Sequence, residues 1–368
     1  MSYSQEHYYL DNLLSFSPLS LYWLNKAKKL FETWEKIFKA SYSEYRSLKL
    51  EPEIIADWLS RRDSIKLSDH LDQLKQKKIF LVLPEDPLFP RQLLDIPDCP
   101  NQIYWRGNIN CLKEKALAIV GSRKASRFAR STIEHLLKSL SDNQITIVSG
   151  LAFGVDSLGH ETALSLDWPT VAVLAGGIDD ESIYPANNYQ LAQNIIKQGG
   201  VLLSEYPPKS KPRPEWFIAR NRIIAGLAQA TLIVECSIKS GSLWTAQFAN
   251  KYNRSVLSVP GSILDSTQAG NNKLIQEGAL VAASAEDLAV CLEIDLSSNK
   301  KKQKQVVKLS PSCQLVLECL RQGPKDLAKI CLEIPQLTTE QILADLALLE
   351  LEDLIKISAG ENYYLISP

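Results

Sequence analysis

The stretch "ALAIVGSRKASRFAR", residues 116–130, decides the fold. It opens as a short apolar run that ends at Gly121, and a stretch with helical character follows. Four basic residues come directly after this turn: Arg123, Lys124, Arg127 and Arg130. A strand that feeds a glycine turn and then a helix is a common phosphate site, because the helix N-terminus carries a partial positive charge. The stretch therefore predicts a phosphate site, for either a nucleotide or a polynucleotide.

Short apolar runs of this kind recur along the chain, and helix-like stretches separate them. The six runs are ALAIV (116–120), ITIVS (145–149), TVAVLA (170–175), VLLSE (201–205), ATLIVE (230–235) and SVLSV (255–259). Such alternation predicts an α/β domain with a doubly wound, mostly parallel sheet that is covered by helices on both faces. Ligands of such sheets bind at the carboxyl ends of the strands, near the switch point in strand order.

The residues that follow the first two strands suit an anion and a base. Gly121 and Ser122 leave backbone N–H groups open to an oxyanion, and Arg123 offers a bidentate fork for phosphate. Gly150 permits a tight turn after the second strand, and Phe153 lies at the tip of that turn. Its ring could stack on a base or pack into the core, and both interpretations stay open.

Two later segments offer further cations. Arg220, Asn221 and Arg222 lie at the head of an apolar helix, where arginines can contact phosphates and the amide can reach a sugar or base edge. The alternative for one arginine is an internal salt bridge with Glu205 or Glu235.

The segment Lys239, Ser240, Gly241 and Ser242 forms another cradle of small donors with one cation. Several such strand ends imply several phosphates in a row, which favours a polynucleotide. Arg127 or Arg130 can instead belong to a solvated helix face.

Several other chemistries are disfavoured. The dinucleotide pattern G-x-G-x-x-G fails, because Arg123 and Ser126 hold its second and third glycine positions. No Walker sequence occurs, so neither a nicotinamide nor ATP is expected, and we predict no cofactor. Asp179, Asp180 and Glu181 are interpreted as a solvated turn rather than a metal site. His160 is expected to cap or pack a helix.

Composition sets the remaining limits. The chain has 368 residues and a formal net charge of −1, so any basic surface must be local. Its seven cysteines include no C-x-x-C pair, which is typical of reduced thiols in a cytosolic protein. The N-terminus does not resemble a signal peptide, and no apolar run approaches ~20 residues. We therefore expect a cytoplasmic protein with no membrane span.

The chain divides into four segments. Residues 1–80 show short amphipathic helices, and the proline-rich stretch that begins near residue 84 is an ordered linker or edge structure. Residues 81–295 hold the predicted sheet. Residues 296–309 are a polar, basic linker. Residues 310–368 show three helices and two short strands, the outline of a winged helix.

The motifs at the strand ends together resemble those of the DNA-processing protein A (DprA, or Smf) family. The matching stretches are VGSRKAS (120–126), SGLAFGVDSLGHETAL (149–164), GGIDDESIYP (176–185), LLSEYPP (202–208), ARNRIIAGLA (219–228), KSGSLWTA (239–246), VPGSI (259–263) and AGNNKLIQEGA (269–279). The resemblance implies an extended Rossmann-like domain, preceded by a helical, SAM-like domain and followed by a winged helix.

The family resemblance also implies a function. The implied function is that of a non-enzymatic recombination mediator, which binds and protects single-stranded DNA and helps load the RecA recombinase during natural transformation. The resemblance also implies a homodimer. The residues expected to bind DNA are Gly121, Ser122, Arg123, Lys124, Gly150, Phe153, Arg220, Asn221, Arg222, Lys239, Ser240 and Gly241. Phe153 departs from the family, which commonly has arginine there, so a cation is lost and stacking is the interaction expected to replace it.

Two further expectations complete the sequence analysis. The stretch TTEQILADLALLELED (338–353), at the position of a recognition helix, contains five acids and no Lys or Arg, so it would be repelled by duplex DNA and is expected to contact protein instead. The alternative function is a nucleotide-processing Rossmann-like enzyme of the phosphoribohydrolase type. KSGSLWTAQFA (239–249) lies where that enzyme has its loop, but it offers no glutamate for the catalysis.

Overall fold

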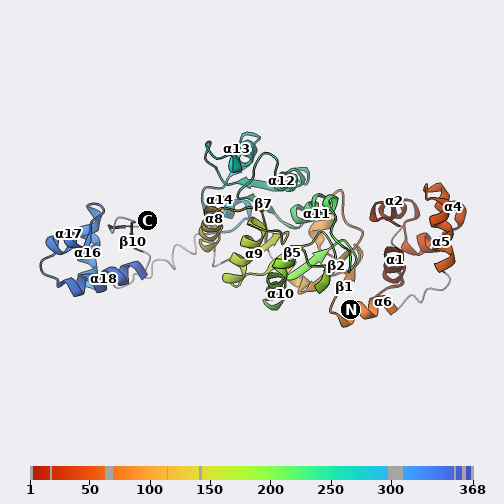
Figure 1. Ribbon diagram of the computed structural model, residues 1–368, viewed down its shortest axis with the longest axis horizontal. Helices are drawn as coiled ribbons and strands as arrows, with labels where there is room; N and C mark the ends of the chain where they lie inside the picture. The colour runs from red at the N-terminus through yellow and green to blue at the C-terminus, as the bar shows by residue number, and fades with distance from the viewer. Residues whose placement is uncertain are drawn as a thin grey trace. The chain divides into compact units, whose positions relative to one another are not determined.

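The computed structural model describes residues 3–16, 19–62, 69–113, 115–140, 143–296, 310–351, 354–358 and 362–365. The chain forms two compact units, Met1–Leu296 and Ser297–Pro368 (Figure 1). The predicted linker lies outside the described residues except for its first residue, Leu296. The helical and sheet segments predicted as separate domains are both within the first unit.

The first unit begins with six helices: α1 (Gln5–Ser15), α2 (Leu21–Phe31), α3 (Trp34–Lys39), α4 (Tyr42–Ser47), α5 (Pro52–Arg62) and α6 (Asp69–Gln76). Capping side chains fix where several of them start, since Ser20, Thr33 and Ser41 accept hydrogen bonds from the first turns of α2, α3 and α4. The first five helices enclose a core rich in aromatic residues, including Trp34, Tyr45 and Trp58.

A nine-stranded sheet forms the centre of the unit. Its strands are β1 (Phe80–Val82), β2 (Ile103–Gly107), β3 (Ala116–Val120), β4 (Thr146–Ser149), β5 (Thr170–Val173), β6 (Val201–Ser204), β7 (Ala230–Ile233), β8 (Ser255–Ser258) and β9 (Leu280–Val281). Their order is β1-β2-β6-β5-β4-β3-β7-β8-β9. Strands β3 to β9 pair in parallel, whereas β1 and β2 add an antiparallel edge. The mostly parallel sheet is confirmed, and the six predicted runs are β3 to β8.

Helices cover both faces of the sheet, because successive strand residues point to opposite sides. One face carries Ala118 and Val120 of β3 and packs on α7 (Arg91–Leu94), α11 (Pro214–Leu227) and α12 (Ser242–Lys251). The opposite face carries Leu117 and Ile119 and packs on α8 (Arg127–Lys138), α9 (Val155–Ser165) and α14 (Ala285–Cys291). Helix α10 (Tyr189–Lys197) covers this second side nearer β6.

Short elements complete the unit: η1 (Ile109–Lys113), η2 (Asp180–Ser182), η3 (Ala186–Asn188), η4 (Ser266–Gln268) and α13 (Ala269–Gln276). No helix in the described part of the chain is both long and apolar enough to cross a membrane. The seven cysteines are unpaired, and each is buried or half-buried.

The second unit consists of α16 (Pro311–Arg321), α17 (Leu327–Glu333), α18 (Thr339–Leu351) and the antiparallel pair β10 (Ile355–Ile357) and β11 (Tyr363–Leu365). Its assignment as a winged helix stays a prediction. Of the five acids noted in the α18 segment, Asp345 is buried against Cys313, so it cannot contribute to an acidic outer face. Glu352 and Asp353 lie outside the described residues.

Helix α1 is buried on two sides. One side contributes Leu10 and Leu13 to the helical core, and the other packs Tyr8 against the core around β1 and α6. Two histidine–aspartate pairs join these parts. His7 Nε2 lies 2.7 Å from Asp86 Oδ2, and His70 Nδ1 lies 2.8 Å from Asp11 Oδ2. The helical segment is therefore fixed to the edge of the sheet.

A buried arginine fixes the ends of β4 and β5. The guanidinium of Arg220, on α11, donates to the carbonyl oxygens of Gly150 (2.8 Å) and Val173. A side chain at Gly150 would overlap this guanidinium, which explains the glycine there. Asp156 accepts from the amides of Gly150 (3.1 Å) and Ala152 (3.4 Å), and its charge favours that of Arg220. Burial nevertheless lowers the pKa of Arg220 to about 10, so it stays charged at neutral pH.

The buried amide of Asn271 likewise fixes the end of β7 and also donates to Ser258 Oγ of β8 at 3.2 Å. Asn271 donates to the carbonyl oxygens of Ile233 (3.0 Å) and Val234 (3.2 Å) and accepts from the amide of Cys236 (2.6 Å). Two interior side chains thus define the strand ends on either side of β3.

We expect Arg220→Met to lower the free energy of unfolding by about 3–5 kcal/mol, because it leaves two buried carbonyl groups without a donor and Asp156 without its cation. Urea unfolding of the full chain measures this loss. The matched control is Lys197→Met, an exposed lysine at the end of α10, which should change stability by less than about 0.5 kcal/mol. A loss below about 1 kcal/mol for Arg220→Met would show that other contacts hold the strand ends.

The His70–Asp11 pair should make stability depend on pH. The hydrogen bond to Asp11 raises the pKa of His70 above its ordinary value of about 6.5. A raised folded-state pKa adds stability below the unfolded-state pKa, and this gain is lost as the pH rises through the folded-state value. The Tm difference between wild type and His70→Gln should therefore be largest near pH 5.5 and shrink toward pH 8. His135→Gln, on the exposed face of α8, is the control; a pH-independent difference would contradict the expectation.

Candidate nucleic-acid interface

A groove lies at the switch point of the sheet. From β3 the chain proceeds through β4, β5 and β6 on one side, and it then returns to β7 on the other. The loops after β3 and β7 consequently diverge, which is where open α/β sheets bind ligands. The groove is lined by Val120, Gly121, Ser122, Arg123, Lys124, Ala152, Asp156, Tyr184, Pro214, Phe217, Ile218, Arg220, Asn221, Ser237, Ser240, Gly241, Ser242, Thr245 and Thr267.

The loop after β3 is held in one conformation by its neighbours. The Ser122 amide donates to the Glu235 carbonyl oxygen at 2.6 Å, and the Val155 amide donates to the Ser122 carbonyl oxygen at 3.1 Å. A Cβ on Gly121 would come within 2.7 Å of that Glu235 oxygen, so only glycine fits. Gly154 has a φ of +75° and also faces the loop. This packing directs the exposed side chains of Arg123 and Lys124 outward.

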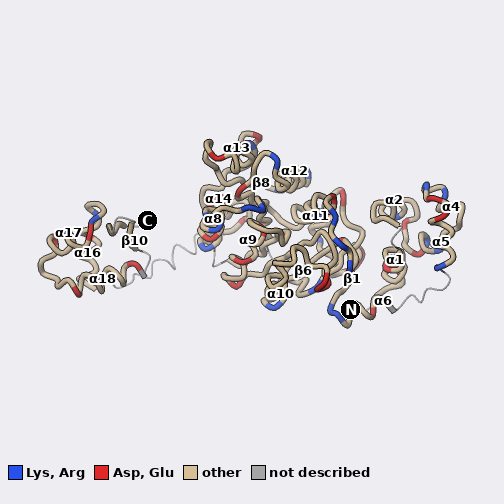
Figure 2. The backbone as a smooth tube through the Cα atoms, in the orientation of Figure 1, with Lys and Arg blue, Asp and Glu red and all other residues tan. Residues whose placement is uncertain are grey.

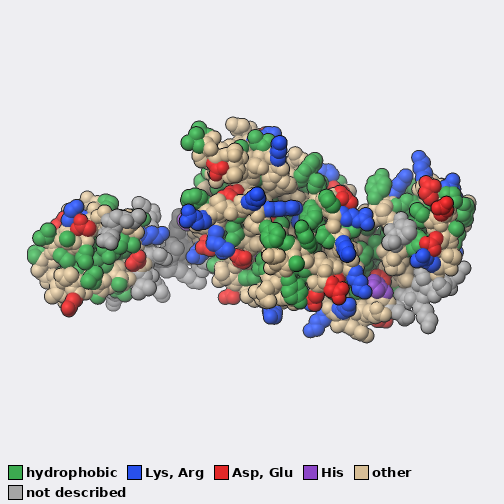
Figure 3. Space-filling model, in the orientation of Figure 1, with side chains coloured by type: hydrophobic (Ala, Val, Ile, Leu, Met, Phe, Trp, Pro, Cys, Tyr) green, Lys and Arg blue, Asp and Glu red, His purple; other side chains and the backbone are tan. Residues whose placement is uncertain are grey.

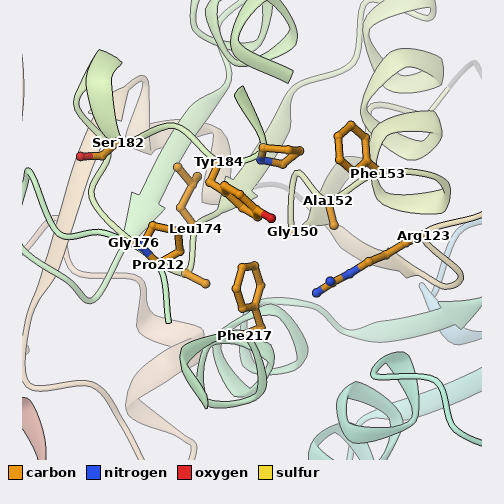
Figure 4. Close-up of a pocket in the computed structure, with 12 residues that line it drawn as sticks. Arg123, Gly150, Ala152, Phe153, Leu174, Gly176, Ser182, Tyr184, Pro212 and Phe217 are labelled. Carbon is orange, nitrogen blue, oxygen red and sulfur yellow. The ribbon is translucent and has the colours of Figure 1, made fainter. Parts of the chain in front are cut away.

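Arg123 lies between the groove and an adjoining pocket, called here the aromatic niche, which is lined by the rings of Phe153, Tyr184 and Phe217. Its guanidinium lies 5.1 Å from the centroid of the Phe217 ring, and the Tyr184 ring meets Phe217 edge-on at 5.8 Å. Phe153 is 45% exposed and lines the same niche. Figure 4 shows Arg123 of the β3–α8 loop, Tyr184 of the segment before η3 and Phe217 of α11 pointing toward one another, with Phe153 of the β4–α9 loop farther out. A cation beside exposed rings can hold a phosphate and an unstacked base together.

The start of α12 contributes small polar groups. Ser240 Oγ lies 2.7 Å from Ser242 Oγ, and Asn221 Nδ2 donates to the Gly241 carbonyl oxygen at 3.3 Å. Asn221 therefore links α11 to the cradle predicted from the sequence. Lys239 is exposed but does not line the groove.

The structure brings most of the predicted site residues together. Eight line the groove: Gly121, Ser122, Arg123, Lys124, Arg220, Asn221, Ser240 and Gly241. Gly150 and Phe153 line the adjoining niche with Arg123. Arg220 is buried and bonded to backbone, so its side chain supports the site rather than presenting a free cation.

Arg222 does not face the groove. Its side chain is 12% exposed, Nη2 lies 2.5 Å from Glu205 Oε2, and Nη1 donates to the Asp98 carbonyl oxygen at 2.6 Å. Burial raises the pKa of Glu205, and the Arg222 charge opposes this shift. The interpretation of an internal salt bridge with Glu205 is thus confirmed, and the structure gives Arg222 no place among the groove residues. Spacing on α11 explains this, since residues two apart on a helix point in different directions.

Several lining residues were not predicted from the sequence. Phe217 precedes Arg220 by three and Asn221 by four positions, so helical spacing could have placed it on their face. Tyr184 lay inside the quoted motif GGIDDESIYP, but it follows the short η2, where no helix or strand spacing indicates the direction of a side chain. Asp156 lay inside a quoted motif, but only the fold shows that its carboxylate holds the turn after β4.

The other titratable candidates are structural. His160 is buried with Nδ1 2.6 Å from Thr170 Oγ1, and burial lowers its pKa to about 3, so its interpretation as a packing residue is confirmed. The acidic turn is less solvated than expected: Asp179 is buried and accepts from the Lys209 amide, whereas Asp180 pairs with Arg106 at 2.6 Å. Within the described ranges no group of three or more His, Cys, Asp and Glu side chains could hold a metal ion.

Positive charge is local rather than general. In Figure 2, Lys and Arg alternate with Asp and Glu along the chain, in keeping with the net charge of −1. In Figure 3, basic side chains are spread over the face shown, and some of them lie near its middle. Among the described groove residues Asp156 is the one acid, and it is engaged with backbone amides.

Known proteins are similar to this chain over the region that contains the sheet and the groove. A family model for DNA recombination-mediator protein A matches residues 80–293. The chain is 36% identical over 275 residues to the DNA processing protein DprA of Streptococcus pneumoniae, which covers 73% of this chain and 96% of the relative. It is 40% identical over 201 residues to DprA of Bacillus subtilis, covering 54% of this chain and 67% of the relative.

Two solved structures share the fold. The X-ray structure of Streptococcus pneumoniae DprA superposes with a TM-score of 0.64 at 31% identity and covers 79% of this chain and 98% of that one. DprA of Helicobacter pylori, described for its single-stranded DNA binding mode, gives 0.51 at 27% identity and covers 60% and 96%. The chain therefore belongs to the DNA recombination-mediator protein A family.

Proposed function

We propose that the protein binds single-stranded DNA in the switch-point groove. The observation that carries this proposal is the position of Arg123, whose guanidinium lies over Phe217 at the border of the groove and the niche. A phosphate at Arg123 would leave its base beside the rings of Phe217, Tyr184 and Phe153. Single strands suit such a site, because their bases are free to stack on aromatic side chains.

The groove suits a chain of phosphates better than one nucleotide. Arg123 and Lys124 lie after β3, whereas the Ser240–Ser242 cradle lies after β7, so donors are spread along the groove. Arg123 also fills the position where a dinucleotide would approach the backbone. Base contacts by rings rather than by hydrogen-bonding side chains would make binding tolerant of sequence.

The cellular role rests on family membership. We propose that the protein is a recombination mediator that protects incoming single strands in the cytoplasm and delivers them to the RecA recombinase during natural transformation, without catalysing a reaction. The helical segment 1–80 would be its SAM-like domain. Residues 310–368 would form a winged helix that contacts protein, tethered by the linker 296–309.

A homodimer is part of the proposal. Strand β9 forms one edge of the sheet, and its Leu280 and Val281 side chains are about half exposed. An uncovered apolar edge strand offers a surface on which a second copy could pack.

We expect tight binding of single-stranded oligonucleotide and weak binding of the matched duplex. Arg123→Ala should lower single-strand affinity about tenfold and reduce the slope of log K against log salt by about 0.7, the value for one phosphate contact. Fluorescence anisotropy over a salt series measures both. Lys197→Ala, at an exposed lysine at the end of α10 that does not line the groove, is the control for loss of one charge.

Equal weak binding to both forms, with Arg123→Ala unaffected, would contradict the proposal. The groove would then hold a smaller ligand, and release of base from nucleoside monophosphates would identify the phosphoribohydrolase type of enzyme.

Variants of Phe153 distinguish the contribution of base stacking to DNA binding from the contribution of charge. Phe153→Ala should weaken single-strand binding by about 1–3 kcal/mol through lost stacking, with no change in the salt slope. Phe153→Arg should instead increase the slope by about 0.7, because it adds a phosphate contact. The same anisotropy series tests both variants. Unchanged affinity in Phe153→Ala would exclude the ring from the binding site.

A further inference from the structure

A second hollow lies beyond Phe153, between α8 and α9. Its walls are Ala125, Ser126, Arg127, Arg130, Ser131, Phe153, Gly154, Ser157, Leu158, Glu161 and Asn188. None of the twelve residues predicted to bind DNA lines it except Phe153. The hollow therefore needs an explanation of its own.

Phe153 connects this hollow to the candidate interface. Its half-exposed ring lines both the aromatic niche and the hollow between α8 and α9. The niche in turn shares Arg123, Tyr184 and Phe217 with the switch-point groove. A strand that stacks a base on Phe153 thus has an open surface on the far side of the ring.

The charges in the hollow suit a phosphate. Arg127 is exposed and forms no ion pair within the described residues. Arg130 is neutralised, since its Nη2 lies 2.7 Å from Glu161 Oε2 and its Nη1 lies 3.8 Å from Glu134 Oε1. Arg127 is consequently the cation that a new anion would meet first.

The N-terminus of α8 is not the group that we expect to bind the phosphate. Ser126 Oγ already accepts from the amides of Phe128 (3.1 Å) and Ala129 (3.4 Å), and the Ser126 amide donates to Glu235. The amides of Phe128 and Ala129 in the first turn of α8 therefore already have an acceptor. The exposed Arg127 side chain is the group with which we expect an anion to pair.

We propose that a single strand longer than the switch-point groove continues over Phe153 into the hollow between α8 and α9, where Arg127 binds one of its phosphates. This inference rests on the proposed function and assigns a path to the strand. Arg130 contributes little while Glu161 holds it. Contact in the hollow then depends on the length of the DNA and on one free cation.

Length dependence tests the path in the full-length protein. Oligothymidylates of about 4 and about 16 nucleotides bracket the site sizes of single-strand binding modules. Arg127→Ala should weaken binding of the longer oligonucleotide about three- to tenfold and reduce its salt slope by about 0.7, and leave the shorter one unchanged. Lys138→Ala, an exposed lysine in the last turn of the same helix, should affect neither.

A second variant acts in the opposite direction. Glu161→Gln removes the acid that neutralises Arg130, so it should tighten binding of the longer oligonucleotide and increase its salt slope, with no effect on the shorter one.

Two results would overturn the path. One is Arg127→Ala behaving like Lys138→Ala at both lengths, and the other is equal weakening at both lengths. Failure of the proposed function looks different, because Arg123→Ala would then leave even the shorter oligonucleotide unaffected.

Discussion

The hydrogen bonds from Arg220 to the carbonyl groups of Gly150 and Val173 are the contacts on which the candidate interface depends. They place a full charge in the interior, which is stable only because backbone oxygens and Asp156 surround it. These hydrogen bonds fix α11 against the ends of β4 and β5. Since Phe217 and Asn221 are on the same helix, the position of this one guanidinium determines where the aromatic and amide groups of the groove lie.

Three arginines of the predicted site have three different roles. Arg220 supports the strand ends, Arg222 closes an internal ion pair with Glu205, and Arg123 is left exposed beside Phe217. A chain with no net excess of positive charge can still present cations to a polyanion when its other arginines are used internally. The strength of the interface then comes from placement more than from the number of charges.

The alternation of apolar runs predicted the parallel core of the sheet, because fully buried strands have a strong and simple pattern. Strands β1, β2 and β9 were not among the predicted runs. β1 and β9 are short and lie at the two edges, whereas β2 lies between β1 and β6 in the proline-rich stretch that was interpreted as a linker or edge structure. The exposed Arg123 could be predicted from its glycine turn. An internal salt bridge of one arginine with Glu205 was among the alternatives, but the sequence could not tell which arginine forms it. The burial of Arg220 could not be predicted, since Gly150 and Val173 become its neighbours only when distant strands pair.

The two-sided burial of α1 bears on where the working protein can be shortened. The stretch matched by the family begins at residue 80, yet the core around Leu81 and Tyr104 is completed by Leu71 of α6 and by Tyr8 of α1. A fragment that started at the family boundary would expose this apolar wall to water and leave Asp86 without His7. Helices α1 and α6 therefore cover this side of the sheet, and we expect a stable fragment of this chain to include them.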